Sequence, residues 1–306
     1  MRNRILRATL AMTRQCWEQG MLSYALMRCG ETELHELIAY DMVLRQSADG
    51  RLCNVENTPA VTDSAFCIPA VWALERYRAA AERNVHFLLH DAERTEDGVL
   101  YHMKGTGEIW ADSAAFLPYS LAISGHPDEA YHQMTGILDR LYLPETGLYA
   151  HIWDESARRF LDERAWGVGD GWILTGLLRT ALALDSAHAA QAKELLNRFR
   201  ALLERMLALM TARGGFRDVL DDPDAFEESE TAAMVAVSIY VAVREGILPK
   251  DMLATAEKIR AAVLEKVDER GLVRDASSSP AFDRPGTSVE CQAHMLMMEH
   301  LCLNVK

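Results

Sequence analysis

The chain has 306 residues, of which 49% are hydrophobic and 25% charged, and a formal net charge of -13. This composition is that of an ordinary globular protein, and the length allows either two ordinary domains or one large repetitive domain. The acidic balance argues against a protein that wraps nucleic acid or sits on an anionic membrane surface, and no apolar stretch reaches the roughly 18 residues that span a bilayer.

Six cysteines occur in the chain, at positions 16, 29, 53, 67, 291 and 302. They form no C-x-x-C pair and no zinc-like spacing with histidine, which is typical of reduced thiols in a cytoplasmic protein. The first twelve residues are basic, but Arg7 interrupts their apolar run and no long apolar segment follows, so we expect no signal peptide. The sequence also shows no phosphate-binding loop and no metal-ligand cluster, and we expect no cofactor and no metal.

Apolar periodicity predicts helices along almost the whole chain. Six segments are apolar nearly all round, as buried helices are, and begin near Gln15, Asp63, Asp112, Gly169, Ser229 and Ser288. Six amphipathic segments alternate with them, at residues 2–12, 32–46, 76–91, 127–142, 187–211 and 249–267. This alternation predicts an all-α fold, a single-domain (α/α)6 barrel over residues 1–306 with the apolar helices inside. An open helical solenoid is the alternative, because the pattern does not determine whether the ring closes.

The longer connections all lead from a predicted outer helix to the next inner one, at residues 48–62, 92–111, 143–168, 212–228 and 268–287. In a closed ring they lie on one face, where binding and catalytic residues are expected. Two of them contain patterns typical of short β-hairpins. One hairpin is predicted within residues 98–105, and in the other residues 148–153 pair with residues 159–161.

A short motif occurs twice, each time at the predicted start of an inner helix. It consists of Asp-Ser-Ala followed by proline, first at Asp63 with Pro69 and then at Asp112 with Pro118. An aspartate in this place can accept hydrogen bonds from free backbone N–H groups of the first turn, so both residues can be helix caps. Their recurrence in a repeat architecture, with Trp110 just before the second copy, also favours a functional pair of carboxyl groups.

Carboxylates and indoles are concentrated in the segments that the ring would place on this face. Besides the two aspartates, the candidate binding residues are Trp17, Glu18, Trp110, His151, Trp166, Asp170 and Trp172. Glu228, Glu230 and Glu290 also lie in first turns that the ring would place on this face. Indole rings stack on pyranose rings and carboxyl groups transfer protons or bind hydroxyls, so this set predicts a site for a small oligosaccharide. The simpler interpretations are a plug for the ring (Trp17, Trp172), a surface histidine (His151), and a solvated loop with a helix cap (Glu227, Glu228, Glu230).

Six stretches of the sequence, taken in order, resemble the motifs of glycoside hydrolase family 105 and of its relative, family 88. They are VTDSAFCIPAVWAL, IWADSAAFLPYSLAISG, PETGLYAHIWD, AWGVGDGW, GGFRDVLDDPDAFEESETAAMVA and GTSVECQAHMLMMEH, which together span most of the chain. The resemblance implies the same (α/α)6 barrel that the helix pattern predicts. It also implies an unsaturated uronyl hydrolase, which protonates the C4=C5 double bond of a terminal unsaturated uronic acid and adds water at C5.

By this resemblance Asp112 matches the general acid/base and Asp63 the second aspartate of the site. His151, Trp166 and Trp172 match residues that line the substrate pocket. Such a reaction needs one carboxyl group that is protonated near neutral pH, and burial beside indoles and a second carboxylate can raise a pKa for that purpose.

The sequence departs from the family pattern in its glycine-rich motif. Where the family commonly has W-x-R-G-N-G-W, this chain has Val168 in place of the arginine and Asp170 in place of the asparagine. The change removes the natural bidentate partner of a uronate carboxylate. Lys104, Arg164 and Arg217 are the candidates for a replacement charge.

Two other functions therefore stay open beside the unsaturated uronyl hydrolase. The first is an inverting glycosidase that acts on a saturated, neutral sugar, and the second is a barrel that binds sugar without catalysis. A sugar epimerase is a weaker variant of the first, because no histidine pair is placed to shuttle protons. The sequence does not determine the oligomeric state.

Overall fold

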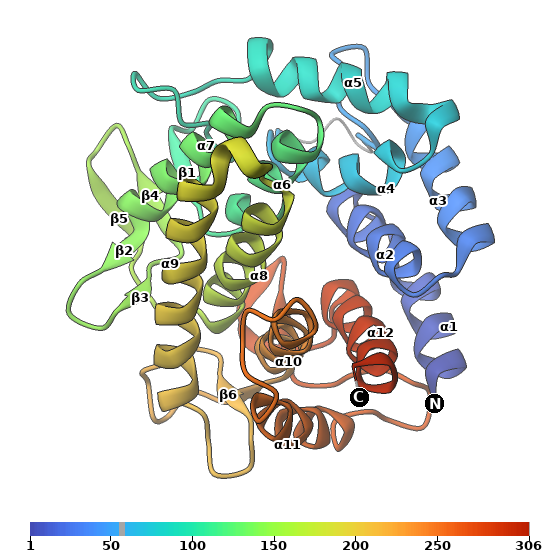
Figure 1. The fold of residues 1–306 in the computed structure, drawn as a ribbon, viewed down its shortest axis with the longest axis vertical. Helices are drawn as coiled ribbons and strands as arrows, with labels where there is room; N and C mark the ends of the chain where they lie inside the picture. Colours follow the sequence, from blue (N-terminus) through green and yellow to red (C-terminus); the bar gives the residue numbers. More distant parts are fainter. Residues whose placement is uncertain (55–58, 306) are drawn as a thin grey trace.

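The computed structural model describes residues 1–54 and 59–305, and its helices form two concentric rings (Figure 1). The inner ring contains α2 (Cys16–Arg28), α4 (Ile68–Trp72), α6 (Ser113–Ile123), α8 (Gly167–Ala183), α10 (Ser229–Arg244) and α12 (Val289–Asn304). The outer ring contains α1 (Arg2–Met12), α3 (Thr32–Leu44), α5 (Arg78–His86), α7 (Pro127–Leu141), α9 (Ala189–Ala208) and α11 (Met252–Leu264). Short helical turns flank them: η2 (Asp63–Phe66), η3 (Glu75–Tyr77), η4 (Phe87–Asp91) and η5 (Ser186–His188).

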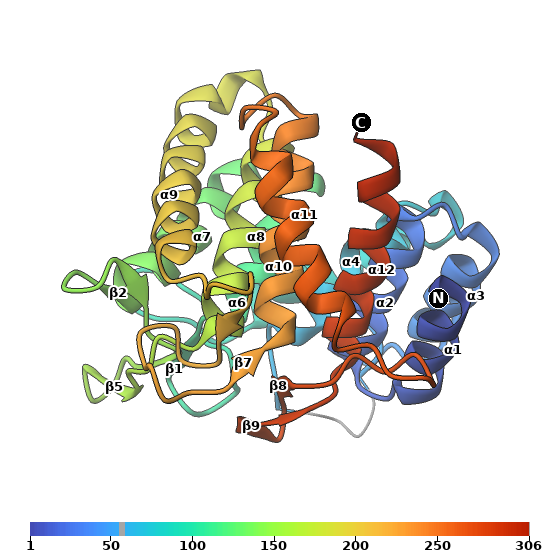
Figure 2. The ribbon, with the colours of Figure 1, turned by 90° about the horizontal axis from the view of Figure 1, so that it is seen from below.

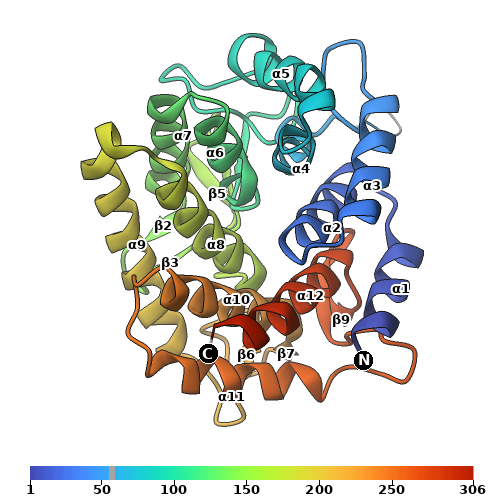
Figure 3. The same cartoon turned by 45° about the vertical axis from the view of Figure 1, so that its right-hand side comes forward.

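The inner ring is closed. Each inner helix packs against the next one around the ring, and α12 returns to pack against α2. Figure 3 shows these two helices side by side, although they come from opposite ends of the chain. The predicted (α/α)6 barrel is therefore confirmed, and the open solenoid is excluded.

Two glycines allow segments of the inner ring to approach each other closely. A Cβ atom at Gly176 of α8 would lie 2.0 Å from the carbonyl oxygen of Ala114, and one at Gly20 of α2 would lie 2.5 Å from the carbonyl carbon of Phe66. Both distances are well below van der Waals contact, so a larger residue would force the backbone to move. These contacts hold α8 against the first turn of α6, and α2 against η2. The two contacts thereby fix the segments that carry the paired aspartates.

The strands gather at one end of the barrel, where the inner helices begin (Figure 2). A three-stranded sheet has the order β1 (Glu108–Trp110), β4 (Ile152–Asp154), β5 (Arg159–Asp162). The remaining strands form antiparallel pairs: β2 (Tyr142–Leu143) with β3 (Leu148–Tyr149), β6 (Phe216–Arg217) with β7 (Glu227–Glu228), and β8 (Ala276–Ser278) with β9 (Ala281–Gly286). The expected face of loops and hairpins is thus present.

The predicted hairpins are correct only in part. Residues 152–154 pair with residues 159–162 as expected, but Leu148 and Tyr149 pair with β2 instead. The hairpin predicted within residues 98–105 is wrong. This segment bonds to different neighbours one residue at a time, with Leu100 bridged to Arg94 and Met103 to Ala60. Because one partner lies before the segment and the other about 40 residues away, the local pattern does not reveal this pairing.

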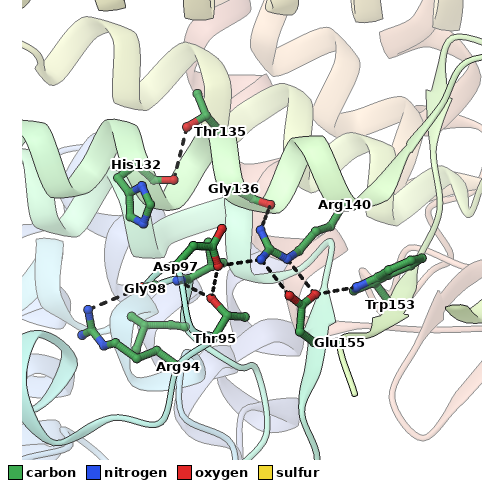
Figure 4. A network of polar contacts seen from close by, with 12 residues as sticks. Arg94, Thr95, Asp97, Gly98, His132, Thr135, Gly136, Arg140, Trp153 and Glu155 are labelled. Atoms are coloured by element: carbon green, nitrogen blue, oxygen red, sulfur yellow. Dashed lines mark hydrogen bonds and ion pairs between the residues drawn. The ribbon is translucent and has the colours of Figure 1, made fainter. Parts of the chain in front are cut away.

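Arg140 of α7 connects two of the loops beside the sheet (Figure 4). Its Nε and Nη2 atoms each donate to the Glu155 carboxylate at 2.9 Å, and Nη2 also donates to Asp97 at 2.7 Å. Glu155 accepts a further hydrogen bond from the Trp153 indole at 2.7 Å. The network anchors β4 and the loop that leads to β1, and the Arg140 side chain is only 15% exposed.

Arg140→Met should lower the free energy of unfolding by about 2 kcal/mol, because Glu155 loses two charged hydrogen bonds in a half-buried place. Urea denaturation followed by circular dichroism measures this change. Arg213→Met is the matched control, since its ion pair with Glu265 is about two-thirds exposed and should contribute about 0.5 kcal/mol or less. Equal losses of unfolding free energy in the two variants would show that the Arg140 network stabilises the fold no more than an exposed ion pair does.

Candidate active site

A cavity of about 200 Å³ opens at the end of the barrel where the strands gather. Carboxylate and aromatic side chains form most of its wall, together with small residues from the β8–β9 hairpin. The lining residues are Trp17, Ala60, Asp63, Phe66, His102, Met103, Trp110, Asp112, Trp166, Val168, Trp172, Glu230, Ser278, Ser279, Phe282 and Glu290. The cavity therefore unites the first turns of the inner helices with the loops above them.

Asp112 stands at the N-terminal end of α6, with one oxygen turned to a histidine. It does not cap the helix through its side chain, and its Oδ2 atom lies 3.3 Å from Nε2 of His151. The other nitrogen of His151 lies 3.2 Å from Asp162, whose carboxylate is held in turn by Arg164 at 2.6 Å. These contacts form a chain that leads from the cavity to the protein surface.

The electrostatics of these contacts favour an ionised Asp112 carboxylate and a protonated His151 imidazole. Burial acts to raise the pKa of Asp112, but the His151 ring holds it below its usual value. Burial likewise acts to lower the pKa of His151, but Asp112 and Asp162 raise it above its usual value. The proton that Asp112 and His151 share therefore resides on the imidazole.

Asp63 lies in η2 and, unlike Asp112, tends to be protonated. Burial, and then the negative charges of Asp112 and Glu290, raise the pKa of Asp63 to about 7. Its neighbour His102, with Nε2 at 3.6 Å, gives no compensating charge, because burial lowers the pKa of this histidine to about 4. Asp63 makes no cap to the helix either, so neither aspartate acts as the helix cap that was the alternative.

Aromatic rings form the walls of the cavity and position one another. Trp110 stacks on the His102 ring, with 4.5 Å between the centroids, and meets the His151 ring edge to face. The Trp166 indole N–H donates to Ser277 at 2.9 Å, which fixes this ring beside Phe282. Indole faces held in this way suit the C–H faces of a sugar ring.

Two glutamates on the cavity wall complete the acidic group. Burial, and then the charge of Glu18, raise the pKa of Glu290 to about 7. Burial and the charge of Glu290 raise the pKa of Glu230 well above its usual value. Glu230 accepts a hydrogen bond from Ser288 at 2.6 Å, and its second oxygen, 4.0 Å from Nδ1 of His294, is buried without a hydrogen-bond partner among the described residues.

The interpretation of residues 227–230 as a solvated loop is wrong for two of its glutamates. Glu228 is 1% exposed and caps α10 as expected, accepting from the backbone N–H groups of Glu230 and Thr231. Glu230 is fully buried. Both follow an acid-rich run that looks solvated locally, and their burial becomes visible only when the ring closes.

Several candidate residues lie outside the cavity wall. Glu18 accepts from the backbone N–H of Gln15 at 2.7 Å, so it closes a capping box at the start of α2. Asp170 is fully buried and accepts from the backbone N–H of Tyr149 at 3.1 Å. His151 is not part of the wall itself but acts on it through Asp112. The other predicted residues, Asp63, Asp112, Trp17, Trp110, Trp166 and Trp172, line the cavity.

Sequence reasoning missed His102, Phe66 and the residues of the β8–β9 hairpin. The hairpin contributes Ser278, Ser279 and Phe282, and no local pattern distinguishes them from an ordinary loop. Glu230 and Glu290, by contrast, were expected on this face because both lie in the first turn of a predicted inner helix, and both line the cavity.

The cavity contains no basic side chain that could replace the missing arginine. Among the described residues of its wall none is Lys or Arg. Arg164 is paired with Asp162, and Arg217 donates to the carbonyl group of Pro223 at 3.1 Å. Lys104 does not line the cavity. The three candidates for a replacement charge thus lie outside the wall.

Two further properties bear on function. Within residues 1–54 and 59–305, no three His, Cys, Asp or Glu side chains are arranged to hold a metal ion. In the same part of the chain, no helix has both the length and the apolar character needed to cross a membrane.

Comparison with known proteins agrees with the motifs. The chain is 25% identical over 283 residues to the unsaturated rhamnogalacturonyl hydrolase YesR of Bacillus subtilis, covering 87% of this chain and 80% of that protein. A possible member of family GH105 from Salmonella enterica superposes with a TM-score of 0.81 at 19% identity, covering 94% and 82% of the two chains. The unsaturated glucuronyl hydrolase of Bacillus sp. GL1 superposes with a TM-score of 0.69 at 16% identity, covering 93% and 85%.

These likenesses to solved structures support the fold, and the sequence profile supports the family. Residues 13–285 match the profile of Glycosyl Hydrolase Family 88, which covers most of the chain and all of the cavity except Glu290. The chain therefore belongs to glycosyl hydrolase family 88, as its resemblance to families 105 and 88 indicated.

Proposed function

We propose that the protein removes a terminal unsaturated uronic acid from small oligosaccharides by hydration of its C4=C5 double bond. The observation that carries this proposal is the pair of aspartates at one indole-walled cavity, with the pKa of Asp63 raised to about 7 and that of Asp112 lowered. The relatives are named for unsaturated uronyl substrates, which agrees with it.

Asp112 acts as the general acid/base and receives its proton from His151. A uronate that enters the cavity brings a negative charge close to Asp112 and raises the pKa of this carboxyl group, so the proton shifts to it from the imidazole. Asp112 then donates the proton to C4, and water adds to C5 as its own proton passes to Asp112. The hemiketal formed at C5 opens to a ketone, and the hemiacetal left at C1 releases the second sugar.

Asp63 acts in its neutral form. As a carboxylic acid it donates a hydrogen bond to the substrate and adds no negative charge beside Asp112. The indoles of Trp110 and Trp166 exclude water from the reacting carbons and strengthen these interactions.

The cellular setting is also a proposal. All six cysteines lie in the described part of the chain, where they are buried and form no disulfide bond. This favours a reducing compartment, the cytoplasm, where the enzyme would act on short products of polysaccharide lyases during polysaccharide degradation. We propose that residues 1–306 act as one catalytic domain.

Loss of ultraviolet absorbance by the conjugated double bond tests the reaction directly. Wild-type protein should remove this absorbance from at least one unsaturated uronyl disaccharide, and Asp112→Asn should lower kcat by about 10³-fold because it cannot deliver the proton. Asp221→Asn, which changes an exposed carboxylate, should leave kcat unchanged. An Asp112→Asn variant as active as the wild type would remove Asp112 from the mechanism.

The pH dependence of kcat/KM should follow the ionisation of the carboxyl groups that are neutral at acidic pH. Asp63 and Glu290 both have pKa values raised to about 7, so both are protonated below this pH and ionise above it. The value of kcat/KM for an unsaturated uronide should therefore fall as pH rises through 7, with a slope steeper than one because two groups lose protons. Glu290→Gln removes one of these two groups from the cavity wall, and the slope should approach about one. An unchanged slope would show that Glu290 does not influence the reaction.

A second candidate function is hydrolysis of a saturated, neutral sugar with inversion. The observation that favours it is the cavity wall, which has four carboxyl groups and no Lys or Arg among its described residues. On this hypothesis neutral glycosides release reducing sugar, while the absorbance of unsaturated uronides does not change.

Substitution at Val168 distinguishes the two candidates. For an unsaturated uronyl hydrolase, Val168→Arg places a guanidinium at the cavity wall and should lower KM about tenfold by pairing with the uronate carboxylate. Val168→Met, with similar added length and no charge, controls for overpacking. If both variants change KM equally, the arginine does not recognise the carboxylate, and this result supports hydrolysis of a neutral sugar.

A further inference from the structure

A second cavity, of about 390 Å³, lies at the opposite end of the barrel from the active site. Its wall is formed where the inner helices end, as Figure 2 shows for α8, α10 and α12. Its volume is within the range of small-molecule sites in proteins. The charged and titratable residues of the wall are Arg28, Arg179, Arg244, Glu245 and His300.

Arg179 is the feature of this cavity that ordinary helix stabilisation does not explain. Its guanidinium lies against two adjoining rings, with Cζ 5.0 Å from the centroid of Tyr24 and 4.5 Å from that of Phe116. Its Nη1 atom is buried and has no hydrogen-bond acceptor in the described part of the chain. A buried cation without an anionic partner is costly, and ring contacts compensate only part of that cost.

The other two arginines have an ordinary structural reason. Arg28 and Arg244 occupy the last turns of α2 and α10, where a positive charge interacts favourably with the helix dipole. Arg179 lies within α8, whose last turn has no basic residue. A role at the helix end therefore does not account for Arg179.

Positive charge is in excess at this cavity, although the whole chain has a net charge of -13. Glu245 is the one carboxylate of its described wall, and this residue is paired with Arg244 at 2.9 Å. No ion pair joins Arg28 or Arg179 to a carboxylate within residues 1–54 and 59–305. Burial, together with Arg2, Arg28 and Arg244, lowers the pKa of His300, which agrees with a locally positive potential.

We propose that this second cavity binds one small oxyanion, a carboxylate or a phosphate carried on a compact apolar body. The guanidinium of Arg179, which lines the cavity and is partly exposed, pairs with the oxyanion, and the exposed side chain of Arg28 adds a second positive charge at the wall. Tyr119, Leu178, Val241 and Met297 supply the apolar contacts for the remainder of the ligand. Nothing in the proposed reaction uses this cavity, so it is a separate binding site.

Isothermal titration calorimetry with sodium benzoate and with sodium phosphate tests the site and compares the two anion types. Wild-type protein should bind about one equivalent of at least one of them, at fixed ionic strength. Arg179→Met keeps the length of the side chain and removes the charge, and it should weaken binding about tenfold or more because the anion loses its charged donor. Tighter binding of benzoate assigns a carboxylate, and tighter binding of phosphate assigns a phosphate.

The controls keep this test independent of catalysis. Arg213→Gln removes a distant surface charge and should leave the affinity unchanged. If Arg179→Met gives no cooperative thermal transition, Arg28→Gln at the wall replaces it and should weaken binding at least about threefold. The proposal is overturned if neither anion binds to the wild type, or if the arginine variant that is tested binds as tightly as the wild type.

Discussion

The convergence of the inner helices at one end of the barrel is the constraint from which the active site follows. Each of these helices starts at the cavity, and carboxyl groups occupy several of the first turns. The positive end of a helix stabilises a carboxylate, whereas burial destabilises it. Which effect prevails differs from residue to residue. Asp112 has the charged His151 imidazole beside it and stays ionised, whereas Asp63 has only the neutral His102 imidazole beside it. The pKa of Asp63, like that of Glu290, is about 7.

The same geometry has a counterpart at the other end, where all these helices finish. There the exposed carbonyl groups favour cations, and Arg28 and Arg244 occupy the last turns of their helices. The two cavities thus differ in charge because parallel inner helices present opposite poles to them. Close contacts at Gly20 and Gly176 keep the segments in register, and a shift there would disturb the active-site aspartates first.

Most of the fold could be predicted from the sequence, because buried and amphipathic helices alternate with a clear period. The repeated Asp-Ser-Ala motif also located two residues that the structure places at one cavity. First-turn positions also placed Glu230 and Glu290 on this face, although the acidic run before Glu230 looks solvated. His102 was not predictable, since it reaches Asp63 from a loop without periodicity. Glu18 shows the reverse error: with Gln15 it forms a capping box, and this local role explains the residue without a ligand.

The missing arginine does not by itself exclude a uronate. Below pH 7 Asp63 and Glu290 are neutral, burial raises the pKa of Glu230 well above its usual value and favours its neutral form, and the charges of Asp112 and His151 cancel. The cavity then repels an anion little and offers carboxylic O–H groups as hydrogen-bond donors to its carboxylate. As pH rises through 7 these donors become acceptors with negative charge, and the same cavity disfavours the anion. Protonated carboxyl groups can thus replace the lost guanidinium, but only on the acidic side of neutrality.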